Sequence, residues 1–149
     1  MKSNLLILKN IFLSALLFIT LSSFCLPIIL SDSDKIIGTY WSPDKDGKIS
    51  IYKRNGKYYG KSVASNTPEL KDINNPNPSL RDKIVLGQEV FFDFTYDEDD
   101  DEYEDGKIYN PLDGKTYNAK MWLDDTDLKL RGYVGISLFG MTKTLERVK

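Results

Sequence analysis

Residues 48–63 read KISIYKRNGKYYGKSV and contain the strongest fold signal in the chain. The residues on either side of a central Asn55-Gly56 pair are largely β-branched, aromatic or alternating, which predicts two strands, with Ile49 and Ile51 on one face of the first. Asn-Gly is the pair that a two-residue type I′ turn prefers, because both of its central residues need positive φ. The stretch therefore predicts an antiparallel β-hairpin.

The same pattern continues on both sides of this hairpin. Further strands are expected at 35–41, 84–94, 107–109, 115–123, 128–131 and 141–148. Asp46-Gly47 and Asp113-Gly114 indicate two more turns of the hairpin type. About eight strands with no helical pattern predict an all-β fold, a single small antiparallel, lipocalin-like barrel that removes its edges by closing.

Two segments interrupt the strand pattern. Residues 64–83 form a long Pro- and Asn-rich excursion, and a connection of this length in a small domain is typically a functional lid or a mobile loop. As a lid it would bring Arg81 and Asn75 over the barrel mouth; alternatively, these residues only pin the excursion to the barrel wall. Residues 97–105 hold eight carboxylates. We expect a solvated acidic turn there rather than a cation site, because no Gly or Asn bends the backbone around an ion.

The N-terminal residues 1–30 have the composition of a targeting segment. Lys2 and Lys9 precede an uncharged, largely apolar run that extends to Asp32. The pattern predicts a signal peptide, with an uncleaved membrane anchor as the alternative. In both cases we expect the remaining domain, residues 31–149, to function outside the cytoplasm. Cleavage would take the net charge from −2 to −4, since it removes two lysines and no acid.

Two absences in the composition exclude whole classes of chemistry. The chain has no histidine, and its only cysteine, Cys25, lies in the N-terminal segment. An imidazole base, a thiolate nucleophile and zinc sites built on His or Cys are therefore excluded from the domain. The acidic balance argues against nucleic-acid binding. We expect a protein that is not an enzyme and uses no metal or cofactor.

Several motifs together resemble a bacterial exported family, domain of unknown function 2147 (DUF2147). The matching segments are GTY at 38–40, NGKYYGK at 55–61, NPNPSLR at 75–81, GKIYNPLDGKTY at 106–117 and LKLRGYVG at 128–135. The resemblance implies a calycin-like barrel in the periplasm or outer envelope of a Gram-negative bacterium, with no established activity. Tyr40 and Leu145 stand near positions where this family commonly has tryptophan. Both departures argue against a barrel base that is closed by a tryptophan ring packed on the Arg147 guanidinium.

The candidate ligand-binding residues are aromatic, cationic or amide side chains. Tyrosine rings inside a barrel would form a pocket for a small amphipathic or apolar ligand, and Arg131 could bind a carboxylate or phosphate through two parallel hydrogen bonds. The candidates are Tyr59, Tyr109, Tyr117, Arg131, Tyr133, Asn75 and Arg81. The alternative is that the rings fill the barrel, and that the protein contacts a partner through the excursion or the acidic turn. Membrane association through residues 1–30 is expected if they stay uncleaved.

Overall fold

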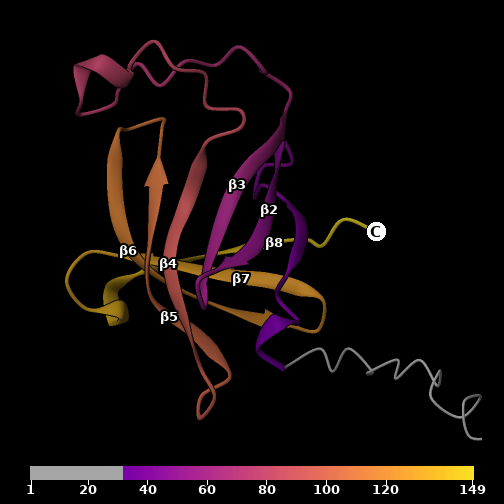
Figure 1. Ribbon diagram of the computed structural model, residues 1–149. Helices are drawn as coiled ribbons and strands as arrows, with labels where there is room; N and C mark the ends of the chain where they lie inside the picture. The colour runs from indigo at the N-terminus through magenta and orange to yellow at the C-terminus, as the bar shows by residue number, and fades with distance from the viewer. Residues whose placement is uncertain (1–31) are drawn as a thin grey trace, which may run out of the picture.

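The computed structural model describes residues 32–149, which form one eight-stranded antiparallel sheet with its strands in sequence order (Figure 1). The strands are β1 (Gly38–Trp41), β2 (Gly47–Arg54), β3 (Lys57–Ser65), β4 (Glu89–Asp97), β5 (Glu102–Asn110), β6 (Lys115–Asp124), β7 (Asp127–Tyr133) and β8 (Met141–Leu145). Three short 3-10 helices accompany them: η1 (Asp32–Asp34), η2 (Pro78–Leu80) and η3 (Ser137–Phe139). The predicted eight-stranded meander is confirmed. The targeting segment predicted at residues 1–30 lies outside the described residues.

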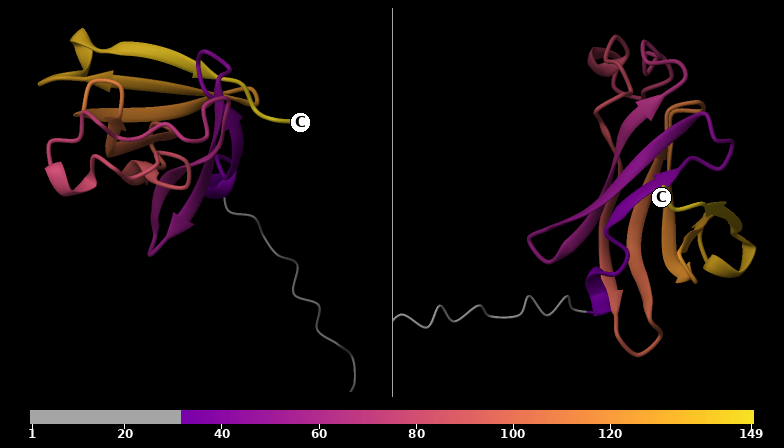
Figure 2. Two further views of the ribbon diagram at one scale, coloured as in Figure 1. Left: turned by 90° about the horizontal axis from the view of Figure 1, so that it is seen from above. Right: turned by 90° about the vertical axis from the view of Figure 1, so that its right-hand side faces the viewer.

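The sheet curls until β1 meets the C-terminal residues that follow β8, which gives a nearly closed barrel (Figure 2). The residues that follow β8 pair with β1, because the Trp41 amide donates to the Glu146 carbonyl at 2.8 Å and the Val148 amide donates to the Thr39 carbonyl at 2.9 Å. These bonds satisfy edge groups that an open sheet would expose. The C-terminal tail therefore completes the barrel.

Arg147 covers the base of the barrel, the end at which η1 lies. Its guanidinium donates to the carbonyls of Lys35 at 2.7 Å and Ile37 at 3.1 Å, and lies 4.7 Å from the centre of the Tyr40 ring. Gly38 makes room for it, since a Cβ there would lie 2.3 Å from an Arg147 nitrogen. The expectation that the missing tryptophans count against a closure through Arg147 is therefore wrong. Arg147 does close the base, and the Tyr40 ring lies where a tryptophan ring was expected.

Buried side chains fill the half of the barrel next to this closure. The Tyr58 and Tyr103 rings meet edge to face with their centres 4.9 Å apart. Their hydroxyls donate to η1, at 2.8 Å to the Asp34 carboxylate and at 2.6 Å to the Ser33 carbonyl. Around them pack Ile36, Tyr40, Ile51, Phe94, Met121 and Leu128, all fully buried. In this lower half, side chains therefore fill the barrel, as the alternative interpretation of the sequence expected.

The connections differ in detail from the sequence expectations. Within residues 32–149, Asn55-Gly56 is the one pair with positive φ at both central residues of a two-residue turn, at 52° and 78°. The excursion runs from 66 to 88 rather than 64 to 83, because pairing with β2 keeps Ser65 in β3 and a positive-φ turn at Gly87 delays β4. The acidic turn is limited to 98–101, since the carboxylates on either side pair within β4 and β5.

Residues 32–149 contain all the parts of an independent folding unit. The closed sheet, its buried core and the arginine closure lie between Lys35 and Val148. In the described part of the chain, every buried side-chain nitrogen and oxygen has a hydrogen-bond partner. A chain of this size buries about two-thirds of its unfolded surface, which is enough for one stable core.

Replacing Gly106 with alanine should destabilise the barrel, because the new Cβ would lie 2.3 Å from the ring of Phe94. Overpacking of this kind costs about 1–3 kcal/mol of unfolding free energy, measured by urea denaturation. Gly132→Ala is the matched control, since its Cβ would meet only the flexible end of Ile108 at 2.9 Å. Equal losses in the two variants would contradict this account of the core.

Candidate ligand-binding site

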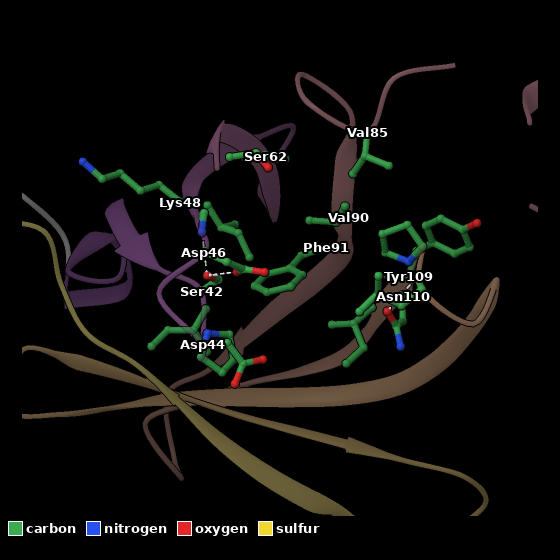
Figure 3. A pocket seen from close by; sticks show the side chains of 18 of the residues that line it. Ser42, Asp44, Asp46, Lys48, Ser62, Val85, Val90, Phe91, Tyr109 and Asn110 are labelled. Atoms are coloured by element: carbon green, nitrogen blue, oxygen red, sulfur yellow. Dashed lines mark hydrogen bonds between the residues drawn. The ribbon is translucent and has the colours of Figure 1, made fainter. Parts of the chain in front are cut away.

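The upper half of the barrel contains a cavity of about 280 Å³ (Figure 3). Six apolar side chains from five strands form its wall, and Leu70 and Val85 of the excursion lie at its upper side. The six are Ile49, Val90, Phe91, Ile108, Leu130 and Leu145. The small residues Ser62 and Ala64 face the same space from β3. The cavity exists because these positions of β3 carry no ring, whereas Tyr58 fills the corresponding space below.

Polar groups gather at one side of the cavity, on the turn between β1 and β2. The Ser42 hydroxyl donates to the Asp46 carboxylate at 2.6 Å and accepts the Gly47 amide at 2.9 Å, which fixes the shape of the turn. Asp44 and Asp46 are exposed carboxylates at this rim. Lys48 also borders the cavity, but its amine lies 4.3 Å from the centre of the Trp41 ring and points away from the cavity (Figure 3). The charge facing the rim is therefore negative.

The excursion is fastened over this end of the barrel by Asp72. This carboxylate is only 1% exposed, and its two oxygens accept hydrogen bonds from the Tyr109 hydroxyl at 2.5 Å and the Asn75 amide at 2.6 Å. Burial and the adjacent Asp72 carboxylate raise the pKa of Tyr109 to about 12, since both disfavour the phenolate. The neutral hydroxyl is thus held as a donor throughout the physiological range.

A second contact brings the excursion against the turn between β5 and β6. The Asn74 side-chain amide donates to the Leu112 carbonyl at 2.9 Å. Gly114 permits this approach, because its φ is +69° and a Cβ would lie 1.9 Å from the Asn74 carbonyl oxygen. The excursion is therefore an anchored cover. Between it and the outer face of β4 and β5 lies an open groove of about 500 Å³, which Asn75 and Tyr109 also line.

The seven predicted ligand contacts do not gather around the cavity. Tyr109 is the one that lines it, and Arg81 donates to the Asn75 carbonyl at 2.8 Å within the excursion. Contact of these seven residues with a ligand stays a prediction.

The other candidates lie elsewhere on the barrel. The hydroxyls of Tyr59 and Tyr117 donate to the exposed carboxylates Asp93 and Asp113 at 2.7 Å each. Arg131 braces the connection between β7 and β8, and Tyr133 is half-buried at the end of β7. Sequence reasoning missed most of the apolar wall, although the alternation that puts Ile49 on an inward face is the signal that identifies it.

In the acidic turn, the Asp101 carboxylate is bound by side chains of the protein itself. Asp101 accepts hydrogen bonds from the Lys35 amine at 2.7 Å and the Tyr96 hydroxyl at 2.9 Å. These bonds, the one from Lys35 above all, hold the pKa of Asp101 below its usual value. Among residues 32–149, no three acidic side chains converge in the manner of a metal site. No helix in this part of the chain has the length and hydropathy of a membrane span.

Comparison with known proteins gives two matches. The family model described as an uncharacterized protein conserved in bacteria, DUF2147, matches residues 38–147. Protein HP1028 from the human pathogen Helicobacter pylori, whose structure is described as belonging to the lipocalin family, superposes with a TM-score of 0.67. It is 27% identical in sequence, and the match covers 76% of this chain and 83% of that one. No protein with a curated description matches the chain significantly.

Replacing Tyr109 with phenylalanine should release the excursion, because the buried Asp72 carboxylate loses one of its two side-chain donors. An unsatisfied buried acceptor costs about 1–3 kcal/mol. We expect faster proteolysis within residues 66–88, detected by mass spectrometry of the fragments. Tyr117→Phe is the control, since its partner carboxylate is exposed to water. The role assigned to Asp72 would be wrong if both variants were cleaved at the wild-type rate.

Proposed function

Because the chain belongs to the DUF2147 family of bacterial proteins and folds as a lipocalin-like barrel, we propose that it is a non-catalytic carrier of a small amphipathic or apolar ligand. The ligand would occupy the upper cavity beneath the excursion. The observation that carries this proposal is the contrast between the two halves of the barrel. Aromatic rings fill the base, whereas the space above it is bounded by apolar side chains and left open.

The size of the cavity limits the ligand. An engineered apolar cavity of about 150 Å³ in another protein binds benzene, so a volume of about 280 Å³ would accept a group roughly twice that size. This volume lies just below the range of about 300–1,000 Å³ that is usual for drug-sized ligands. A compact ligand, or a longer one whose polar end projects past the rim, fits these dimensions.

The charge at the rim favours a ligand with a neutral or positive polar end. Asp44 and Asp46 border the cavity, while the amine of Lys48 is turned toward Trp41. Arg131, the cation first considered for an anionic ligand, is engaged by carbonyls of the connection between β7 and β8. An alkyl amine or alcohol therefore suits the rim better than a fatty acid does.

Filling the cavity should weaken ligand binding. The test measures displacement of the neutral fluorescent probe N-phenylnaphthylamine by decylamine and by decanoate. We expect decylamine to displace the probe at a concentration up to about five-fold lower than decanoate, which is the range for exposed charge interactions. Ala64→Phe should weaken probe binding by about ten-fold or more, because the ring would take up much of the cavity.

Val63→Phe is the matched control, since Val63 is the adjacent residue of β3, is 46% exposed and does not line the cavity. Thermal unfolding of each variant checks that the barrel remains folded. Equal probe binding by both variants, or no binding by the wild type, would contradict the carrier proposal. It would favour the alternative in which the protein acts through contact with a partner.

We also propose that the domain acts in the periplasm or outer envelope, which rests on the composition of residues 1–30. Cell fractionation followed by mass measurement tests this proposal. We expect the protein in the periplasmic fraction, with a mass that lacks about the first 30 residues. An intact chain in the membrane fraction would indicate an uncleaved anchor. Recovery of the protein in the cytoplasm would contradict export.

A further inference from the structure

The connection between β7 and β8 exposes a concentrated set of apolar side chains. Within eight residues, five large apolar side chains are at least 60% exposed, and Phe139 is 81% exposed. The five are Val134, Ile136, Leu138, Phe139 and Met141. We call residues 134–141 the apolar tip. It projects from the side of the barrel, apart from both the excursion and the acidic turn (Figures 1 and 2). Apolar patches of this kind on a soluble domain mark contact surfaces.

The apolar tip is held in this exposed shape by Arg131. Its guanidinium donates to the Ser137 carbonyl at 2.7 Å, the Leu138 carbonyl at 3.0 Å and the Thr142 hydroxyl at 2.9 Å. Gly140 packs closely beneath, since a Cβ there would lie 2.8 Å from the Gly132 carbonyl oxygen. A loop without these constraints could fold its apolar side chains back onto the barrel. The protein instead presents them to its surroundings.

Several backbone groups around η3 are hydrogen-bonded within the protein, which lowers the cost of moving this part of the tip into an apolar environment. The carbonyls of Ile136 and Ser137 accept the amides of Phe139 and Gly140, and the carbonyls of Ser137 and Leu138 accept bonds from Arg131. Satisfied backbone groups are what a segment needs in order to enter hydrocarbon, where an unpaired polar group is costly. Ser137 is the one polar side chain between 134 and 141.

The charges beside the tip are positive, in a chain whose net charge is negative. Residues 128–145 contain Lys129, Arg131 and Lys143 and no acidic residue. Within residues 32–149, neither Arg131 nor Lys143 forms an ion pair, whereas Lys129 pairs with Asp124 at 3.3 Å. Because the Arg131 guanidinium is engaged by carbonyls of the tip, Lys143 is the cation available to an external anion. Apolar side chains flanked by cations are typical of segments that insert at the interface of an anionic membrane.

We propose that the apolar tip docks the barrel on an anionic lipid surface, with Leu138 and Phe139 entering the interface and Lys143 contacting lipid headgroups. The half-buried Tyr133 lies at the start of the tip, where an amphipathic ring suits the headgroup layer. This attachment is separate from the N-terminal segment. It also stands independently of the carrier proposal, because it uses none of the residues that line the cavity.

The test is co-sedimentation of residues 32–149 with vesicles of equimolar phosphatidylglycerol and phosphatidylcholine, compared with pure phosphatidylcholine. Residues 32–149 are used because they form a complete folding unit and exclude the apolar N-terminal run. We expect stronger binding to the anionic vesicles that weakens with added salt. The double variant Leu138→Ser/Phe139→Ser should reduce binding by about ten-fold or more, and Lys143→Ala by about five-fold.

Two exposed substitutions elsewhere serve as controls. Val63→Ser removes an exposed apolar side chain from β3, and Lys57→Ala removes an exposed charge from the first residue of the same strand. Both should bind as the wild type does, and unchanged thermal unfolding should verify the fold of every variant. Wild-type binding by the double variant, or absence of binding to anionic vesicles, would overturn the proposal. Light scattering would also overturn the proposal if the wild type were a dimer and the double variant a monomer. The tip would then be a contact surface for a second copy of the chain.

Discussion

The contacts of the Arg147 guanidinium are the constraint on which the rest of the barrel depends. This side chain joins three parts of the chain that are distant in sequence: the carbonyls of Lys35 and Ile37 before β1, the carbonyl of Thr126 between β6 and β7, and the C-terminal tail itself. The guanidinium holds five donors in a fixed planar arrangement, whereas a lysine ammonium has three donors grouped on one atom and cannot span such widely separated carbonyls. Because the tail is fixed in this way, β1 finds its second neighbour and the sheet closes.

Closure at one end explains why the two halves of the barrel differ. Rings from β3 and β5 meet beneath Arg147 and use their hydroxyls to hold η1, so the base is solid. Farther along β3 the inward positions carry Ser62 and Ala64, and the barrel is hollow. The hollow is covered by an excursion whose attachment depends on one buried carboxylate, Asp72. A rigid base beneath a covered apolar cavity is an arrangement suited to holding a small molecule.

Arg131 and Arg147 both stabilise irregular backbone segments, at different places on the barrel. Each arginine donates to backbone carbonyls, and within residues 32–149 neither forms an ion pair with a carboxylate. Arg147 closes the core, whereas Arg131 keeps a set of apolar side chains outside it. The carrier and membrane proposals therefore concern separate surfaces of one scaffold, the first inside the barrel and the second on the tip between β7 and β8.

The sequence by itself determined the fold class, the strand count and the first hairpin, because alternation and the Asn55-Gly56 pair are local properties of the chain. The same motifs also identified the family. The tertiary structure decided where the functional surfaces lie, because closure brings together side chains that no local pattern links. The sequence presents Arg131 as a cation on a strand that could bind a ligand carboxylate or phosphate, yet its guanidinium donates to carbonyls only six and seven residues later. Tyr109 lies at the cavity and also at the outer groove, where its hydroxyl donates to Asp72 of an excursion that is 37 residues away in the sequence.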